Sequence, residues 1–203
     1  MNTLSTNVIA TWDPLYAVIN NCNLLIDFAP EAKAADPTFS EKEYNSYMAE
    51  ALTVRSMLYF YLIRTFKEIP LKLKGSYKDT DVVTIGQTPA ATVLAQIEAD
   101  LLKAQALLPE NHAEVSALFT NVNASNTGRI TKAAATTLLA EVYLWNEDYD
   151  KAGVELDKVL NMSRFRLLGR SNASIFDGTT AETIFEISHK DSRANPMYSL
   201  VVD

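Results

Sequence analysis

The chain has 203 residues, of which 48% are hydrophobic and 21% are charged, an ordinary balance for a globular protein. Its 18 Lys and Arg residues against 25 Asp and Glu residues give a net charge of −7, which argues against nucleic-acid binding because that function needs clustered basic side chains. No apolar run reaches about 18 residues, so the sequence predicts no membrane span. The single cysteine, Cys22, cannot form an internal disulfide and is expected to be a small core residue.

The N-terminal residues 1–9 lack the charged and apolar regions of a signal peptide. Cys22 does not follow such regions either, as a lipid-attachment cysteine would. Composition is compatible with a cytosolic protein and equally with a chain from which export signals have been removed, so both interpretations stay open at this point.

The first predicted helix covers residues 11–28, with Pro14 in its first turn, where a missing backbone N–H costs nothing. Apolar residues at helical spacing predict its buried stripe, which consists of Leu15, Val18, Ile19, Cys22, Leu25 and Ile26. Prolines and alanines between Pro30 and Pro37 are expected to form the connection to the next helix.

The stretch from Ser40 to Phe66 is predicted to be the longest and most buried helix. It is apolar on two faces at the helical period, which is typical of a central helix with other elements packed on both sides. Ser40 and Glu43 match the S-x-x-E capping box, and Pro70 ends the segment.

Three further helices are predicted, at residues 88–108, 131–145 and 149–160. A short polar turn at 146–148 joins the last two, so they are expected to lie antiparallel. Small residues on the first of this pair and a Tyr-x-x-Ala opening the second resemble a tetratricopeptide unit, although the glycine of that motif is absent. The polar segments 72–87 and 111–128 are expected to be loops, the first with a short strand at 82–85.

Past residue 162 the pattern changes, and residues 165–168 and 183–188 are predicted to be short strands. The sequence therefore predicts a mainly α fold of tetratricopeptide-like antiparallel helix pairs, an α–α superhelix, with a few short C-terminal β-strands. One domain is expected over the whole chain, with a tail at 1–10, a helical platform at 11–162, and strands and a loop at 163–203 that begin a truncated C-terminal part.

Motifs that would indicate chemistry are missing from the sequence. It contains no GxGxxG, no P-loop and no nucleophile elbow. His112 and His189 have no neighbouring ligand at metal spacing and are interpreted as a surface-loop histidine and a strand-edge histidine. No catalytic residue, metal site or cofactor is therefore expected, and a glycosidase with two opposed carboxylates stays open only as a minor alternative.

Arg55 and the two tryptophans allow both a structural and a functional interpretation. Arg55 is a permanent cation on an otherwise apolar stripe. We favour pairing of its head with a carboxylate or with helix-end carbonyls over recognition of an anionic ligand. Trp12 and Trp145 could stack on sugar rings, but at helical positions both are expected in the core.

Four blocks of sequence stand in a distinctive order and spacing. They are Trp12-Asp13-Pro14-Leu15-Tyr16 with Ile19, Asn20 and Asn23; Ala49-Glu50-Ala51 through Arg55 and Tyr59-Phe60-Tyr61-Leu62 to Phe66, then Ile69-Pro70-Leu71; Ile97-Glu98-Ala99-Asp100-Leu101 with Ala104 and Leu107-Leu108-Pro109; and Gly128-Arg129 with Lys132-Ala133-Ala134, Leu138-Leu139-Ala140, Tyr143-Leu144 and Tyr149 to Ala152. Together with the segment 182–187, they resemble the SusD/RagB family of outer-membrane nutrient-binding lipoproteins over roughly residues 12–189. Lys67 departs from the family, which usually has glycine at that position.

The resemblance implies a binding protein rather than an enzyme, with oligosaccharide as the commonest ligand class. It implies a position on the extracellular face of the outer membrane, held by a lipid anchor that is absent from this chain. It also implies delivery of the ligand to a SusC-like, TonB-dependent transporter. Among the loop residues, Arg193, Asn195 and Tyr198 combine a stacking ring with polar groups for hydroxyls and are the predicted ligand contacts. The competing function is a cytosolic tetratricopeptide-like scaffold that binds a protein or peptide.

Overall fold

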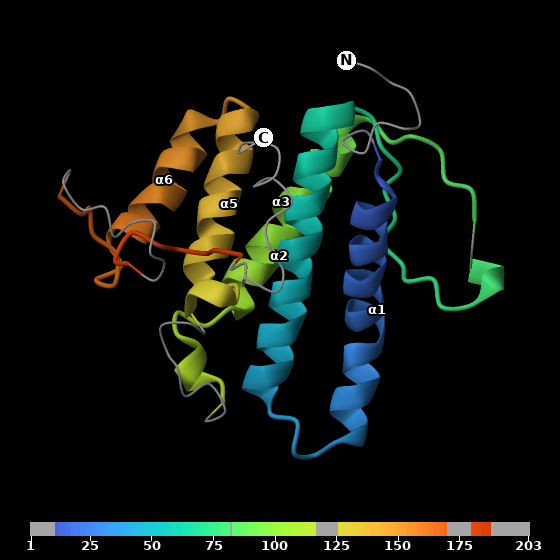
Figure 1. Cartoon of the computed structure of the whole chain (residues 1–203), viewed down its shortest axis with the longest axis horizontal. Coiled ribbons are helices and arrows are strands. Elements are labelled where there is room, and N and C mark those ends of the chain that lie inside the picture. Colours follow the sequence, from blue (N-terminus) through green and yellow to red (C-terminus); the bar gives the residue numbers. More distant parts are fainter. Residues whose placement is uncertain (1–10, 82, 117–125, 170–179, 188–203) are drawn as a thin grey trace, which may run out of the picture.

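A computed structural model describes residues 11–81, 83–116, 126–169 and 180–187 of the chain. Figure 1 shows that this part of the protein is built from α-helices lying side by side. Their bounds are α1 Asp13–Ala35, α2 Glu41–Phe66, α3 Ala90–Leu107, α5 Lys132–Trp145 and α6 Tyr149–Leu160. Two short 3₁₀ turns lie in the loops, η2 Asp79–Asp81 and η3 His112–Glu114.

Each helix packs mainly against its neighbours in the sequence. The packed pairs are α1 with α2, α2 with α3, α3 with α5, and α5 with α6, while α2 also touches α5 along one edge. Successive helices run in opposite directions (Figure 1). This row of antiparallel helix pairs confirms the mainly α, tetratricopeptide-like fold class.

The short C-terminal strands of the prediction are not formed by the residues that the structure describes. Residues 165–168 and 183–187 contain no strand. The Arg166 N–H donates to the Ala181 carbonyl at 3.1 Å, whereas the Glu186 N–H donates to a carbonyl of a different segment at 2.9 Å. A ladder requires successive residues to pair with one partner strand, and such single bonds to separate segments cannot form one.

The strand predicted at residues 82–85 is also not observed in the described residues 83–85. The backbone pairing near this loop is an isolated antiparallel bridge between Ile69 and Thr88. The Thr88 N–H donates to the Ile69 carbonyl at 2.9 Å. The bridge brings the two ends of the long loop together just before α3 begins.

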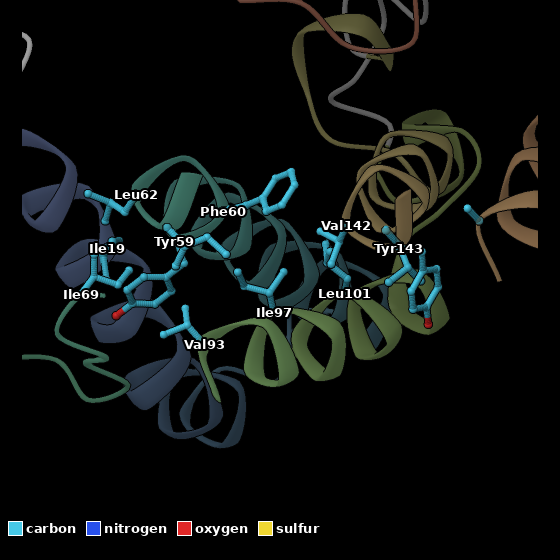
Figure 2. Packing of buried hydrophobic residues seen from close by; sticks show 13 residues of the cluster. Ile19, Tyr59, Phe60, Leu62, Ile69, Val93, Ile97, Leu101, Val142 and Tyr143 are labelled. Carbon is cyan, nitrogen blue, oxygen red and sulfur yellow. The ribbon is translucent and has the colours of Figure 1, made fainter. Parts of the chain in front are cut away.

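The central position of α2 is as predicted. The Glu43 N–H donates to Ser40 Oγ at 3.2 Å and the Ser40 N–H donates to Glu43 Oε2 at 3.0 Å, which completes the capping box. The helix packs against α1 on one side and α3 on the other. Figure 2 shows the resulting core, in which the labelled residues are Ile19, Tyr59, Phe60, Leu62, Ile69, Val93, Ile97, Leu101, Val142 and Tyr143.

Helix α1 continues beyond its predicted end and includes Pro30. A proline inside a helix removes one backbone hydrogen bond, but the alanine-rich sequence that follows has a high helix propensity. The helix stops before Pro37, because the preceding residue, Asp36, avoids the helical region and has φ −115° and ψ 104°. Pro37 rather than Pro30 is therefore the signal that ends α1.

The buried face of α1 also differs from the predicted stripe. Ile19 and Cys22 are buried as expected, but Val18 and Leu25 are exposed. The polar residue Asn23 is fully buried instead. Its amide has hydrogen-bond partners in the core, which compensate the loss of water and explain why an apolar pattern did not predict it.

The segment that follows α2 folds back along α1. The Ser76 N–H donates to Asn20 Oδ1 at 2.8 Å, and Asn20 Nδ2 donates to the Ser76 carbonyl at 3.0 Å. The Gly75 N–H donates to Asp27 Oδ2 at 2.9 Å. A Cβ at Gly75 would lie 2.5 Å from Leu24 Cδ2, so a larger residue could fit only if this leucine moved.

The C-terminus of α2 ends in a strained turn at Lys67, which has φ 70° and ψ −66°. The Lys67 N–H donates to the Ile63 carbonyl at 2.9 Å. The Glu68 N–H donates to the Phe66 carbonyl at 2.9 Å, which is the i to i+2 bond of a γ-turn centred on Lys67. A Cβ is unfavourable at a positive φ, so this position suits glycine better than lysine.

Replacement of Lys67 by glycine is expected to stabilise the protein. Relief of the backbone strain contributes roughly 1–3 kcal/mol, and the greater freedom of glycine in the unfolded chain offsets about 0.4–1 kcal/mol of it. We expect the free energy of unfolding, measured by urea denaturation, to rise by about 1 kcal/mol. Lys67→Ala is the matched control, because it removes the same side chain but keeps the Cβ and should leave stability within about 0.5 kcal/mol of wild type. Equal stability of the two variants would contradict the strained turn.

Candidate binding site

A buried charged network lies at the centre of the helical platform. Arg55 of α2 is only 4% exposed. Its Nε and Nη2 atoms both donate to the carboxylate of Asp100 on α3, each at 2.9 Å, and form a bidentate pair. Its Nη1 donates to Asn23 Oδ1 of α1 at 2.8 Å. One guanidinium therefore joins three helices, and the structural interpretation of Arg55 is confirmed.

The network extends to the segment that follows α2. Asn23 Nδ2 donates to the Lys72 carbonyl at 2.9 Å, and the Lys72 N–H donates to the Tyr59 hydroxyl oxygen at 2.9 Å. On α3, Gln96 Nε2 donates to Asp100 Oδ1 at 2.9 Å. Because these groups bind one another inside the protein, the network holds helices together and does not present a cation to a ligand.

Burial changes the acid–base properties of this network. It raises the pKa of the Asp100 carboxyl above its ordinary value, while the adjacent Arg55 guanidinium acts in the opposite direction. It also raises the pKa of the Tyr59 hydroxyl to about 12. Tyr59 therefore stays protonated at neutral pH and serves as a hydrogen-bonding group.

An open groove of about 630 Å³ lies where α3, α5 and α6 meet. Its lining residues are Leu102, Gln105, Ala106, Glu110, Lys132, Thr136, Lys158, Asn161, Met162 and Ser163. Its volume is in the range of ligand-binding pockets, and its walls combine ammonium, amide and hydroxyl groups with short apolar surfaces. This groove is the first candidate binding surface for a polar ligand.

Hydrogen bonds among side chains form the floor of this groove. Gln105 Nε2 donates to Glu155 Oε2 at 2.6 Å and to Thr136 Oγ1 at 2.8 Å. Lys158 Nζ donates to Glu155 Oε1 at 2.6 Å. Both oxygens of the buried Glu155 are thus engaged, so this carboxylate orients Gln105 and Lys158 and is poorly placed to act as a base.

A smaller hollow of about 310 Å³ lies at the start of α1. Its lining residues are Trp12, Asp13, Tyr16, Pro70, Lys72, Val83 and Ile85. The Trp12 ring stacks on Phe66 with centroids 5.2 Å apart and an interplanar angle of 13°. The Tyr16 hydroxyl donates to the Pro70 carbonyl at 2.6 Å. Since Phe66 covers one face of the indole, Trp12 acts mainly as a packing residue, as predicted.

Trp145 does not lie in the core, contrary to the prediction. It is 54% exposed and ends α5. Its ring meets the buried Phe60 of α2 at a centroid distance of 6.1 Å and an angle of 89°. Because Trp145 is the last residue of its helix, no further helical turn covers it, and the helical period alone could not show this exposure.

His112 is fully buried, so its interpretation as a surface-loop histidine is wrong. Its backbone N–H donates to Asn126 Oδ1 at 2.8 Å. Its Nε2 lies 2.9 Å from the Ile130 carbonyl, which can only accept, so Nε2 carries the proton. Burial lowers the pKa of the His112 ring below its ordinary value. A single histidine in a polar loop has no periodic pattern that would have indicated this burial.

The described ranges also bear on metal binding and on membrane insertion. Among them, no group of three or more His, Cys, Asp or Glu side chains is arranged to hold a metal ion. No helix in the same part of the chain has the length and apolar character needed to cross a bilayer. The predicted ligand contacts, Arg193, Asn195 and Tyr198, lie outside the described residues and stay a prediction.

Comparison with known proteins decides the family. A SusD-like family model, described as "Starch-binding associating with outer membrane", matches residues 2–144, which is well over half of the chain. The chain belongs to the SusD-like family. The resemblance found in the sequence is thereby confirmed. SusD-like proteins bind carbohydrate and are not catalytic.

Individual SusD-like proteins match much of this chain but only part of their own length. SusD-like protein P2 of Formosa agariphila is 30% identical over 154 residues, which are 76% of this chain and 27% of that protein. A laminarin-binding SusD-like protein is 25% identical, with a TM-score of 0.63 over 77% of this chain and 32% of its own. A SusD homologue from Bacteroides thetaiotaomicron is 27% identical, with a TM-score of 0.70 over 83% of this chain and 32% of its own. The chain therefore spans about a third or less of these relatives.

The groove residues were not found from the sequence. Gln105, Lys132 and Lys158 lie on separate helices, where polar side chains normally indicate a solvated face. Only the packing of α3, α5 and α6 brings them together. The burial of Glu155 could not be predicted either. An acidic residue three positions before a lysine is also typical of an exposed ion pair on a helix.

Removal of the Arg55 side chain is expected to destabilise the protein strongly, because Asp100 is left as a buried carboxylate without its partner. Arg55→Met keeps much of the side-chain volume and should lower the free energy of unfolding, measured by urea denaturation, by about 3–5 kcal/mol. Arg64→Met is the control: its ion pair with Glu141, at 2.7 Å, lies at the surface, so the loss should be about 1 kcal/mol or less. Similar losses in the two variants would show that the network is not the structural centre.

The burial of His112 predicts that stability depends on pH. A histidine in the unfolded chain has a pKa of about 6.5, and the pKa of His112 in the folded protein is lower. Between these two values the unfolded state binds a proton that the folded state does not bind. The free energy of unfolding should therefore fall as the pH drops below about 6.5, with a slope of at most about 1.4 kcal/mol per pH unit.

His112→Gln is the control for this pH dependence, because glutamine does not titrate and its side-chain amide can still donate a hydrogen bond. Urea denaturation of both proteins between about pH 7.5 and about pH 5.5 should give a smaller slope for the variant. The second histidine, His189, is present in both proteins and cancels in the comparison. Identical slopes would contradict the titration of a buried His112.

Proposed function

We propose that the protein binds oligosaccharide at the cell surface and delivers it to a SusC-like, TonB-dependent transporter of the outer membrane. The protein would be held on the extracellular face of that membrane by a lipid anchor. The protein acts on its ligand by binding alone, without hydrolysis and without a metal or cofactor. Nucleic acid is not among its partners.

Family membership is the observation that carries this proposal. The matching family model is described as starch-binding and associating with the outer membrane. The relatives of known structure include a laminarin-binding SusD-like protein and a surface glycan-binding protein A from Bacteroides uniformis. These names support glycans as the ligand class. Because the chain spans only about a third of those proteins, the identity of its own glycan is a question for binding experiments.

The groove between α3, α5 and α6 supports the proposal chemically. Gln105, Lys158 and Asn161 carry amide and ammonium groups that can hydrogen-bond to sugar hydroxyls. Glu155 accepts hydrogen bonds from Gln105 and Lys158 and thereby fixes their positions. Side chains held in place before the ligand arrives lose less entropy on binding, which favours affinity.

Arg193, Asn195 and Tyr198 remain the proposed ligand contacts after the helical part of the chain. In this arrangement the Tyr198 ring stacks on a sugar ring, while Arg193 and Asn195 bind its hydroxyls. Their support is the chemistry of the side chains and their place in the sequence, since they lie outside the described residues.

Oligosaccharide binding can be tested by isothermal titration calorimetry of the whole chain with maltoheptaose and laminariheptaose, with a pool of unrelated peptides in parallel. We expect saturable binding of at least one saccharide, no binding of the peptides, and no new reducing ends after prolonged incubation. Tyr198→Ala should weaken binding of that saccharide by about tenfold, because a stacking ring is lost. Tyr77→Ala, which removes an exposed tyrosine from the loop before α3, is the matched control and should bind as wild type does.

Three results would count against parts of this proposal. Binding of peptides in preference to both saccharides would favour the cytosolic scaffold. Release of reducing sugar would contradict a purely binding function. Wild-type affinity in Tyr198→Ala would remove that residue from the ligand site.

A further inference from the structure

The exposed Trp145 belongs to a group of side chains that bridges α5 and α2. Glu141 precedes Trp145 by one helical turn on α5, and Phe60 and Arg64 are one turn apart on α2. We call these four residues, Phe60, Arg64, Glu141 and Trp145, the surface quartet. They lie along the edge where α2 touches α5.

The members of the surface quartet hold one another in place. The Trp145 and Phe60 rings meet edge to face, with centroids 6.1 Å apart at 89°. The guanidinium carbon of Arg64 lies 4.2 Å from the centroid of the Phe60 ring. Arg64 Nη1 donates to Glu141 Oε1 at 2.7 Å. The buried Phe60 thus forms a fixed base, and the other three side chains are oriented on it before any ligand arrives.

The three outer members of the quartet face solvent. Trp145 is 54% exposed, and the side chains of Arg64 and Glu141 are 37% and 52% exposed. A tryptophan is usually much more buried than this, so an exposed indole beside an ion pair is unusual for an ordinary solvated surface. The guanidinium has N–H donors beyond the one bound to Glu141, and the carboxylate has a second oxygen that can accept.

An apolar hollow continues from the quartet along the same edge. Glu141 lines this hollow of about 190 Å³ together with Met57 of α2, Leu138 of α5 and Phe185. Its lining is mostly hydrophobic side chains and two threonines. The quartet and the hollow therefore form one continuous strip, with an aromatic ring at one position, a donor–acceptor pair beside it and apolar surface beyond.

We propose that the surface quartet and the adjoining hollow form a carbohydrate-binding site on the helical platform. This inference rests on the proposed function and adds a location separate from the predicted loop contacts. One pyranose ring stacks its C–H groups on the Trp145 indole, while its hydroxyls bind Arg64 and Glu141. A sugar presents both donors and acceptors on adjacent carbons, and the ion pair supplies the complementary acceptor and donors within the reach of one ring.

The extended shape of the strip favours an oligosaccharide over a single sugar. On α5, the stretch from the first residue that lines the hollow to Trp145 covers about three helical turns, which corresponds to roughly 16 Å. Neighbouring sugar units of the same chain can therefore rest on the apolar surface beside the stacked unit. A protein partner anchored on the exposed tryptophan is the competing occupant, and the binding experiment distinguishes the two.

The two tryptophans of the chain allow a direct measurement at this site. Trp12→Phe leaves Trp145 as the single indole reporter. Titration of this variant with maltoheptaose or laminariheptaose should change its tryptophan emission with the same midpoint that calorimetry gives for binding. Trp145→Ala should lower the affinity for the bound saccharide by at least about tenfold, and Trp145→Phe should recover part of it because a stacking ring remains.

Further variants test the contribution of Arg64 and Glu141 and the specificity of the affinity loss in Trp145→Ala. Arg64→Gln and Glu141→Gln remove the charges but keep hydrogen-bonding groups, so each should weaken binding less than Trp145→Ala does. Tyr149→Ala is the matched control: it removes another exposed aromatic ring, at the start of α6, and should leave the affinity unchanged. Urea denaturation of each variant confirms that it is folded.

The two possible failures can be told apart. If wild type binds a saccharide and Trp145→Ala binds it equally well, this inference is overturned while the proposed function stands, and Trp145 is then better explained as a protein contact. If wild type binds neither saccharide, the proposed function and this inference fall together.

Discussion

The bidentate pair between Arg55 and Asp100 is the constraint on which the helical platform depends. Taking both charges out of water is costly, and the cost is offset only when geometry is good and the remaining hydrogen-bonding groups are also satisfied. Here Asn23 and Gln96 supply those further bonds. Because the partners come from α1, α2 and α3, these helices must meet in one register. Apolar packing alone would tolerate more arrangements, and we infer that the network selects among them.

The surfaces proposed for binding follow from this fixed centre. Once the inner faces of α2 and α3 are set, their outer edges meet α5 in a defined way: the edge of α2 contributes to the surface quartet, and that of α3 to the polar groove. The quartet therefore rests on helices, and the groove takes most of its lining from helices. Sites on rigid elements hold side chains closer to their binding geometry. The buried charge network thus positions the candidate ligand contacts without contacting the ligand itself.

The sequence predicted what depends on local pattern and missed what depends on distant partners. The structural role of Arg55 followed from a permanent charge on an apolar stripe, but its partner Asp100 lies 45 residues away and could not be identified. Residues 165–168 were predicted to be a short strand, yet a strand also needs a neighbour that the local sequence does not contain. Pro30 was overestimated as a stop, since neighbouring alanines maintain α1. The exposure of Trp145 could not be predicted, because it depends on whether another part of the chain covers the end of α5.

The neighbour-to-neighbour packing of the helices has a consequence for how the protein opens and closes. When contacts join mainly adjacent elements, stability resembles a sum of nearest-neighbour terms along one dimension, as in solenoid proteins. Among the described helices, α6 at the end of the row packs against α5 and is joined to α3 by the Gln105–Glu155 hydrogen bond, whereas α1 to α3 are tied together by a shared charge network. Local unfolding should thus begin at α6 and stop before that network, so amide hydrogens would exchange fastest beside the groove and slowest around the guanidinium.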